Sequence, residues 1–361
     1  GAAGGGRWMA MSSETQQSNQ EKLLKELKEE LPQLMDPMYT PKWDLYSSQV
    51  KFVDPLNEFD GVDKYKSNIQ MLRDSPLFTA ADMTLHDAVP QDDGTVITRW
   101  TLGMTFKPFP WQPRLTFTGT SIYYLDNEGK VSKHVDMWDS IDQQSPFSFQ
   151  ALQDLVGQLL PDVTKRGVQA IKGGAVEEIT YKVVRRAPGL EIRKYDDFEL
   201  VETEEEGVYS KETYNEAKNL IRDYHGDALV KATNKNGMML PTTDPVLQLD
   251  IGSGLTNLAY VHATSKRGKA PLPSDDKLTV RSWGDSLVAV KDVRGYGQDR
   301  TRSEASVQTN LEELRKAIAG EGYAIGDANK EAFYLANFAD GYEMWIKVEP
   351  TEASLKCRSS V

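Results

Sequence analysis

Hydrophobic residues recur at helical spacing in five parts of the chain. Side chains three or four positions apart lie on one face of a helix, so each part predicts a helix with one apolar stripe. Pro32 predicts the end or a kink of the first helix, and Gly320 predicts the end of the last. The predicted helices cover residues 20–34, 62–73, 151–160, 211–229 and 304–319.

Other parts of the chain alternate between apolar and polar residues, as a strand with one buried face does. Asn127-Glu128-Gly129 predicts a hairpin turn between two of them. In the first half, helices precede long antiparallel strands, which is an α+β order and suits a curved sheet folded around a helix. The predicted strands cover residues 95–107, 113–125, 130–139, 179–184, 190–195, 258–264, 278–283, 287–293 and 343–348.

The chain has 361 residues, which is long for one core and predicts two domains. Pro161, Gly167, Gly173 and Gly174 indicate a linker between them. The start of the chain is rich in Gly, Ala, Ser and Gln and predicts disorder, either as the remnant of a cleaved targeting peptide or as an added sequence. We expect a disordered segment 1–19, a first domain 20–150, a helix and linker 151–175, a second domain 176–350 and a tail 351–361.

Composition removes several function classes. The net charge of −12 argues against nucleic acid, because binding a phosphate backbone needs clustered Lys and Arg. No apolar run approaches the ~18 residues of a membrane span, so we expect no transmembrane segment. The single cysteine, Cys357, rules out an internal disulfide, a thiolate metal cluster and a covalent c-type haem.

The sharpest chemical feature of the first half is His134-x-Asp136-x-Trp138. Alternation puts all three side chains on one strand face. If that face lines a cavity, it offers an acid/base pair beside an aromatic wall. The other interpretation is a buried polar network in which Asp136 holds His134 and fixes the sheet.

The second half resembles the SOUL family of haem-binding proteins over about 176–350. The strand Leu190–Tyr195, which reads LEIRKY after a Pro-Gly turn, carries the resemblance first. Four further segments follow in the family's order: Met238-Met239-Leu240-Pro241-Thr242, Leu272-Pro273-Ser274-Asp275-Asp276, Val290–Tyr296 and Glu343–Val348. Met239 and Thr242 depart from the family's Met-Thr-x-Pro-Val signature.

This resemblance implies a distorted β-barrel flanked by two helices, with an apolar groove that binds haem or a related tetrapyrrole without a covalent bond. Such a flat apolar ligand with carboxylates on one edge needs an apolar slot and basic residues at its mouth. The candidate binding residues are Leu220, Ile221, Arg222, Tyr224, His225, Lys231, Met238 and Met239.

The sequence does not identify which side chain would bind the haem iron. His225 lies one position past Tyr224 on the 211–229 helix and is the candidate axial imidazole. Histidine ligation does not run through the resembling family, and the favoured interpretation is a helix-end histidine that caps carbonyls or faces solvent. Met238 or Met239 would serve instead, although such methionines are more often core residues. His262, on a predicted strand, is a further alternative.

The first half, over about 40–150, resembles a plant and algal domain of unknown function with the cone-shaped fold of the nuclear transport factor 2-like superfamily. The matching segments are Val53–Asn57, Gly61–Tyr65, Thr98-Arg99-Trp100 and His134–Asp139. The superfamily's functions are diverse, so the resemblance implies a fold and no function.

We therefore expect a non-enzymatic tetrapyrrole-binding protein that acts as a carrier, buffer or sensor. One alternative is a scaffold of plastid lipid bodies, with protein partners and peripheral membrane association. Another is a small-molecule enzyme that uses His134 and Asp136. The plant and algal resemblance implies a chloroplast location after removal of a targeting peptide, with the cytoplasm as second choice.

Overall fold

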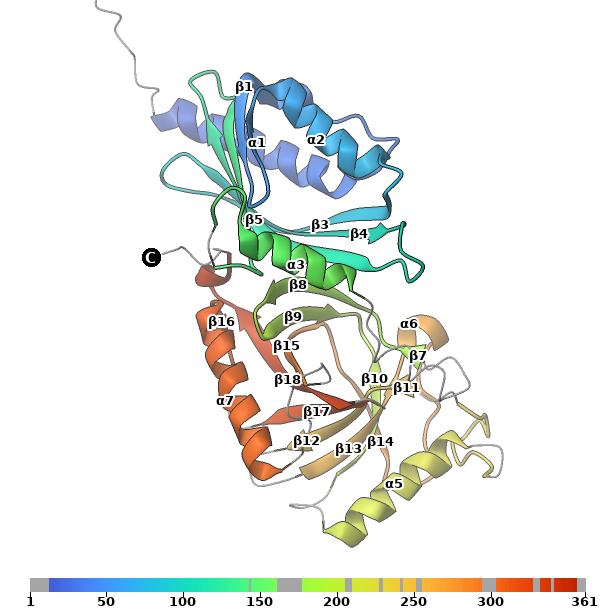
Figure 1. Cartoon of the computed structure of the whole chain (residues 1–361). Coiled ribbons are helices and arrows are strands. Elements are labelled where there is room, and N and C mark those ends of the chain that lie inside the picture. Colours follow the sequence, from blue (N-terminus) through green and yellow to red (C-terminus); the bar gives the residue numbers. More distant parts are fainter. Residues whose placement is uncertain are drawn as a thin grey trace, which may run out of the picture. The chain divides into compact units, whose positions relative to one another are not determined.

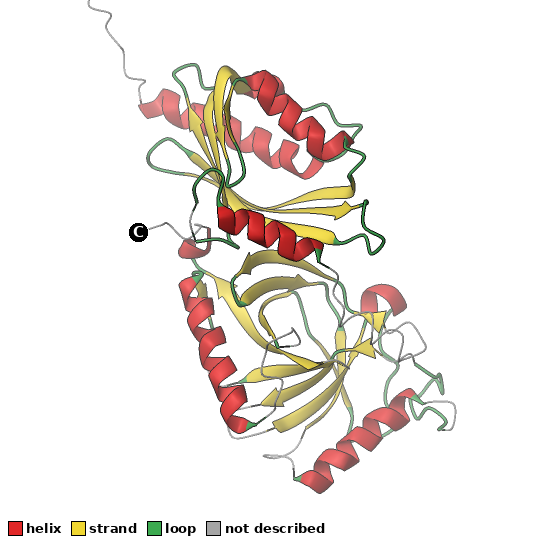
Figure 2. Ribbon diagram, in the orientation of Figure 1, coloured by secondary structure: helices red, strands yellow, loops and turns green. Residues whose placement is uncertain are grey.

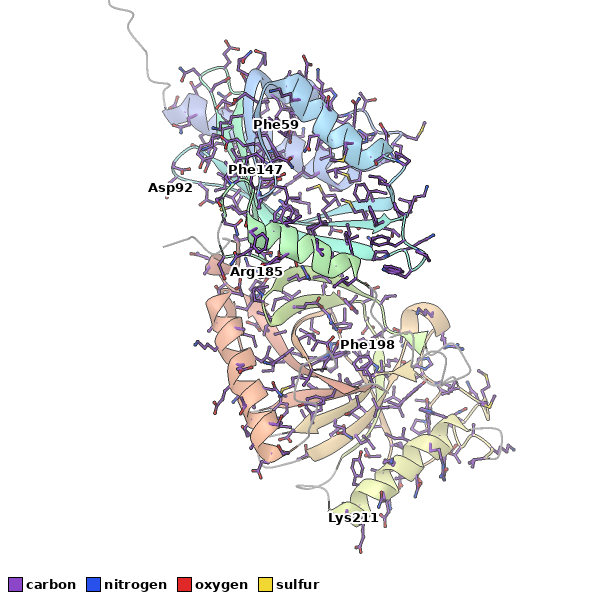
Figure 3. All side chains as sticks on the ribbon, viewed as in Figure 1. Phe59, Asp92, Phe147, Arg185, Phe198 and Lys211 are labelled. Atoms are coloured by element: carbon purple, nitrogen blue, oxygen red, sulfur yellow. The ribbon has the colours of Figure 1, made fainter. Side chains whose placement is uncertain are left out.

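The computed structural model describes residues 13–142, 144–160, 177–204, 210–226, 230–240, 243–250, 255–293, 303–326, 332–338 and 341–355. The chain forms two compact units, one of residues 1–161 with 355–361 and one of residues 162–354 (Figures 1 and 2). The side chains of both units are drawn in Figure 3. Both units mix helices with a mainly antiparallel sheet, which confirms the predicted α+β class.

The first unit is built on a six-stranded sheet in the order β2-β1-β6-β5-β4-β3. All neighbours pair antiparallel except β1 and β6, which are parallel. The sheet curls around α1 and α2, as expected for the cone of a nuclear transport factor 2-like domain (Figure 1). The elements are α1 (Ser13–Glu30), β1 (Tyr46–Val53), β2 (Glu58–Asp60), α2 (Val62–Asp74), β3 (Phe78–Pro90), β4 (Val96–Phe106), β5 (Arg114–Leu125), β6 (Val131–Trp138) and α3 (Phe149–Leu159).

The apolar stripe of α1 packs on the concave face of this sheet. Leu23, Leu27 and Leu31 lie in one buried cluster with sheet residues such as Val50 and Tyr123. Helix α3 begins after the cap residue Ser148, whose side chain accepts a hydrogen bond from the backbone N–H of Ala151. The predicted stripes therefore identify the faces that build this core.

One sequence prediction is wrong in this unit, and one strand was missed. Helix α1 begins at Ser13, inside the stretch predicted to be disordered; the Gln20 amide donates to the carbonyls of Gln91 and Thr95 and ties the helix to the β3–β4 turn. The edge strand β3 was not predicted. Its register against β4 shifts twice and few of its side chains are buried, so its sequence lacks clean alternation.

The second unit is a curled antiparallel sheet in the order β14-β10-β13-β12-β17-β18-β15-β9-β8. Helix α7 packs on one side of it and α5 on another, which confirms the predicted distorted barrel flanked by two helices (Figure 2). Between them lies an aromatic core that includes Trp283 and Trp345. The strands of this sheet are β8 (Tyr181–Ala187), β9 (Leu190–Tyr195), β10 (Glu199–Glu204), β12 (Val246–Asp250), β13 (Leu255–His262), β14 (Thr279–Ser282), β15 (Ser286–Asp292), β17 (Phe333–Phe338) and β18 (Gly341–Pro350).

The remaining elements of this unit are short, apart from its two long helices. Strand β16 (Tyr323–Ala324) pairs with β18, and β7 (Glu177–Glu178) pairs with β11 (Thr243–Asp244) in parallel. The helices are α5 (Lys211–His225), α6 (Thr264–Arg267) and α7 (Glu304–Gly320). No helix in the described residues is long and apolar enough to cross a membrane.

Helix α5 ends four residues before the predicted end at 229. Gly226 has a φ of 71°, which a glycine adopts at little cost. A Cβ at this position would lie 2.7 Å from the backbone nitrogen of Ala232. The chain therefore stops the helix at Gly226 and turns back along it.

Candidate functional site

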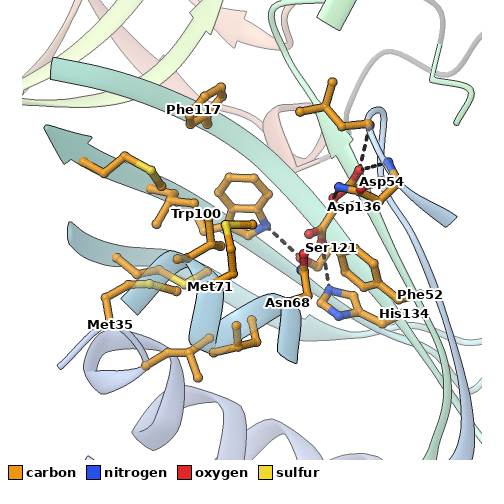
Figure 4. Close-up of a pocket in the computed structure, with 18 of the residues that line it drawn as sticks. Met35, Phe52, Asp54, Asn68, Met71, Trp100, Phe117, Ser121, His134 and Asp136 are labelled. Carbon is orange, nitrogen blue, oxygen red and sulfur yellow. Dashed lines mark hydrogen bonds and ion pairs between the residues drawn. The ribbon is translucent and has the colours of Figure 1, made fainter. Parts of the chain in front are cut away.

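The first unit encloses a cavity of about 290 Å³ between the concave face of the sheet, α2, α3 and the segment after α1 (Figure 4). Most of its lining is apolar, and several side chains are aromatic or methionine. The apolar lining includes Leu31, Leu34, Met35, Phe52, Met71, Met83, Trp100, Leu102, Met104, Phe117, Trp138 and Leu155. The lining contains no Lys or Arg among the residues that the structure describes.

One end of the cavity carries a connected set of polar side chains. The Trp100 indole N–H donates to the Ser121 hydroxyl at 2.7 Å, and that hydroxyl donates to Oδ1 of Asp136 at 2.5 Å. Figure 4 shows these groups on the same side of the cavity as His134. As the alternation predicts, His134, Asp136 and Trp138 all line the cavity.

His134 is 5% exposed and contacts polar groups through both ring nitrogens. Nδ1 lies 2.9 Å from the Tyr65 hydroxyl. Burial raises the pKa of Tyr65 well above its ordinary value, so this phenol is neutral and able to donate.

The Nε2 atom of His134 lies 2.8 Å from Oδ1 of Asp136. This contact is not an aligned hydrogen bond, and Nε2 is buried without a hydrogen-bond partner. A buried polar atom without such a partner is uncommon in folded proteins.

A second carboxylate, Asp54, lies at the same end of the cavity. Its Oδ1 accepts hydrogen bonds from the backbone N–H groups of Leu56 and Asn57, because Asp54-Pro55 opens a tight turn after β1. Burial, and then repulsion from Asp136, raise the pKa of Asp54 to about 6. Sequence reasoning assigned no role to Asp54 or Ser121.

In the second unit, the structure separates the predicted tetrapyrrole residues into two groups. Ile221 and Tyr224 are buried and Leu220 is half-buried where α5 packs on β10 and β13. The Tyr224 hydroxyl donates to the carbonyl of Pro271 at 2.6 Å. Arg222 is exposed and pairs with its neighbour Asp223, so it belongs with the surface group. The face of α5 that carries Ile221 and Tyr224 therefore packs in the hydrophobic core.

The other members of the surface group lie on the loop that follows α5. Met238 and Met239 are 54% and 68% exposed, and Lys231 is exposed as well. The buried Asn234 fixes this loop, because its side-chain amide donates to the carbonyls of Tyr224 and Met238. Its Oδ1 also accepts from the backbone N–H of Met238.

A neighbouring segment brings a third exposed apolar residue to this loop. Leu272 is 58% exposed, and its carbonyl accepts from the backbone N–H of Lys235 at 2.8 Å. We name the exposed side chains of Met238, Met239 and Leu272 the methionine platform. The exposed cations Lys231 and Lys235 belong to the same loop.

His225 ends α5 beside this loop. Its ring lies 3.7 Å, centroid to centroid, from the ring of Tyr260, and its backbone carbonyl accepts from Leu240. Burial, and then the neighbouring His262, lower the pKa of His225 to about 4, so its imidazole is neutral. Nε2 of His225 is buried and has no hydrogen-bond partner.

The other candidate ligand, His262, is 2% exposed, and its Nε2 lies 3.2 Å from the carbonyl of Gly268. No group of His, Cys, Asp and Glu side chains in the described part of the chain has the arrangement of a metal site. Neither fact decides haem ligation, since haem iron needs only one axial side chain. Of the two histidines, His225 has the neutral imidazole and free Nε2 that such a ligand requires.

Comparison with protein families identifies both halves of the chain. Residues 21–134 match the family model described as an uncharacterized conserved protein, DUF2358. Residues 176–349 match the model described as SOUL heme-binding protein. The chain therefore carries a DUF2358 domain followed by a SOUL heme-binding domain, which confirms the predicted order. No curated protein matches the sequence.

Several solved structures are similar to parts of the chain. An NTF2-like protein of unknown function from Exiguobacterium sp. 255-15 is 22% identical over 32% of this chain and 98% of its own, with a TM-score of 0.27. A putative SnoaL-like polyketide cyclase from Jannaschia sp. CCS1 is 12% identical over 42% and 99%, with a TM-score of 0.32. An LEH-like epoxide hydrolase from M. tuberculosis is 12% identical over 44% and 98%, with a TM-score of 0.29. Likenesses this weak carry no weight for function.

Proposed function

We propose that the SOUL domain binds haem or a related tetrapyrrole without a covalent bond, and that the protein carries, buffers or senses this ligand. The observation that carries the proposal is the match of residues 176–349 to the SOUL heme-binding family. The loop after α5 is held against the end of that helix and against Leu272, which gives the proposed site a defined surface.

The methionine platform supports a site at the end of α5. Three exposed apolar side chains on ordered backbone offer a surface to the flat face of a porphyrin. Lys231 and Lys235 are available to its propionate carboxylates. The buried residues Ile221 and Tyr224 then support this surface from below, and they do not contact the ligand in this proposal.

Titration of the full chain tests the proposal. Haemin and metal-free protoporphyrin IX are added separately and followed by absorbance and by tryptophan quenching. We expect saturable one-to-one binding of both ligands at micromolar concentration or below. Absence of saturable binding would exclude the carrier function. It would favour the scaffold alternative, in which the exposed apolar surface binds a protein or lipid partner.

His225→Ala tests the iron ligand. Because burial keeps this imidazole neutral and leaves Nε2 without a partner, it is the side chain best prepared to coordinate iron. We expect the Soret and visible bands of the haemin complex to change in His225→Ala and to stay the same in the control His86→Ala, which lies on β3 of the other domain. An unchanged spectrum in both variants would exclude His225 as the ligand.

Acid/base chemistry in the N-terminal cavity is a second candidate function. The specific observation that favours it is Asp54, whose pKa of about 6 suits proton transfer near neutral pH, at the same end of the cavity as His134 and Asp136. Asp136→Asn would then abolish turnover of a small apolar substrate while the domain stays folded. Loss of the fold in this variant would instead identify Asp136 as part of a structural network.

We also propose a chloroplast location, on the resemblance of the domain pair to plant and algal proteins. Imaging of the complete protein fused at its C-terminus to a fluorescent protein tests this. Fluorescence confined to plastids is the expected result, and diffuse cytoplasmic fluorescence would contradict it.

A further inference from the structure

The N-terminal cavity has an unusual balance of charge. Two carboxylates, Asp54 and Asp136, lie at one end of a largely apolar space whose described lining includes no Lys or Arg. Among the described lining residues, the one basic side chain is the imidazole of His134, which is 95% buried and has an Nε2 without an aligned partner. Buried carboxylates are normally paired with a cation or neutralised.

We propose that this cavity binds a small, mainly apolar molecule that carries one protonated amine, with the ammonium group between Asp54 and Asp136. Three features of the cavity support this ligand class. The carboxylates supply acceptors for an ammonium group, the opposite end is lined by Met35 and Met71, and Trp100 forms part of the wall between them (Figure 4).

Energetics favours a cation over a neutral hydroxyl group. An ammonium group between the carboxylates offsets their mutual repulsion, which a neutral alcohol does not. Phe52, Trp100 and Phe117 also line the cavity, and aromatic rings attract a cation more strongly than a neutral group. The hydroxyl of Ser121 already donates to Asp136 and leaves the second oxygen of that carboxylate for the ligand.

Size separates this ligand from a tetrapyrrole. At ~30 Å³ for each water-sized group, a volume of about 290 Å³ holds on the order of ten non-hydrogen atoms. A porphyrin is several times larger and does not fit. The proposal therefore gives the DUF2358 domain a ligand of its own, independent of the haem site of the SOUL domain.

Calorimetric titration of the full chain with 2-phenylethylamine and its neutral counterpart 2-phenylethanol tests the proposal at pH 7.5. The two probes have nearly the same shape and size and differ in charge. We expect the amine to bind at least about tenfold more tightly than the alcohol. Equal affinity would overturn the assignment of a cation, and failure of both to bind at millimolar concentration would overturn the site. This comparison uses the unaltered protein and does not depend on a variant that folds.

Asp136→Asn locates the binding. Asparagine keeps the shape of the side chain and removes one negative charge, so we expect the amine affinity to fall at least about tenfold and the alcohol affinity to change little. The matched control is Asp92→Asn, which removes the same charge from the exposed turn between β3 and β4 (Figure 3). Equal loss in both variants would show a general effect of net charge and overturn the proposed position. Haemin binding in Asp136→Asn should equal that of the unaltered protein.

Discussion

His134 and His225 are both imidazoles with a buried Nε2 that has no aligned hydrogen-bond partner, and their surroundings differ. His134 lies between a phenol and a carboxylate at the wall of a cavity. His225 lies against the ring of Tyr260, with no carboxylate bonded to its ring among the described residues. Burial favours the neutral imidazole at His225, which is the form that binds iron.

The pH dependence of stability follows from His225. Its pKa falls from an ordinary 6.5 to about 4 because of burial and then of His262. Between these values the unfolded chain binds the proton and the folded chain does not. The stabilisation is therefore complete above pH 6.5 and is lost as the pH falls toward 4. At ~1.4 kcal/mol for each pKa unit, the loss is about 3 kcal/mol.

The measurement is urea unfolding at pH 7 and pH 4.5, for the unaltered protein and for His225→Gln. We expect the variant to lose less stability between the two pH values, because it has no imidazole to protonate. A variant that loses as much as the unaltered protein would show that His225 titrates normally.

At the scale of elements, the segments that carry the SOUL resemblance meet inside the sheet. Arg193 of β9 and Glu343 of β18 lie on strands that flank β15, and their side chains join across it with Nη1 2.8 Å from Oε2. The Trp345 indole N–H donates to the same oxygen at 2.7 Å. Glu343 is fully buried and Arg193 is nearly so. These residues therefore link strands β9 and β18 inside the sheet.

Glu343→Gln should destabilise the SOUL domain strongly. It removes the fully buried one of the two carboxylates that pair with Arg193 and leaves only the half-buried Glu191, which costs about 1–3 kcal/mol. The matched control, Glu349→Gln, changes an exposed residue of the same strand and should cost less than about 0.5 kcal/mol. Urea unfolding measures both. Equal midpoints for the two variants would contradict a structural role for the pair. Replacing both partners, Arg193→Met with Glu343→Leu, should recover much of the stability.

At the scale of the whole molecule, the sequence predicts whatever depends on local periodicity. Alternation correctly puts His134 and Asp136 on one face, and the stripes of the two long C-terminal helices identify the faces that pack. It does not predict Asp54 as a neighbour of Asp136, because Asp54 lies in the turn after β1 and Asp136 lies on β6, and the two come together only when β1 pairs with β6.

The same limit applies around α5, where the predicted binding residues stay a prediction. The helical stripe that contains Ile221 and Tyr224 fits a ligand slot and a core equally well, and the structure gives it to the core. Helix α5 stops at Gly226, whose positive φ is typical of a glycine at a helix end, the same signal that predicts the end of the last helix at Gly320. The sequence does not predict that Met238 and Met239 are exposed, because their exposure depends on the loop that the Asn234 side chain fixes.

Hydrogen–deuterium exchange of the full chain with and without haemin tests the central claim most directly. If the tetrapyrrole binds at the end of α5, haemin should slow exchange in residues 217–226, 230–240 and 270–283 and leave the DUF2358 domain unchanged. Protection confined to the N-terminal domain, or no protection while haemin is bound, would contradict a haem site on the methionine platform.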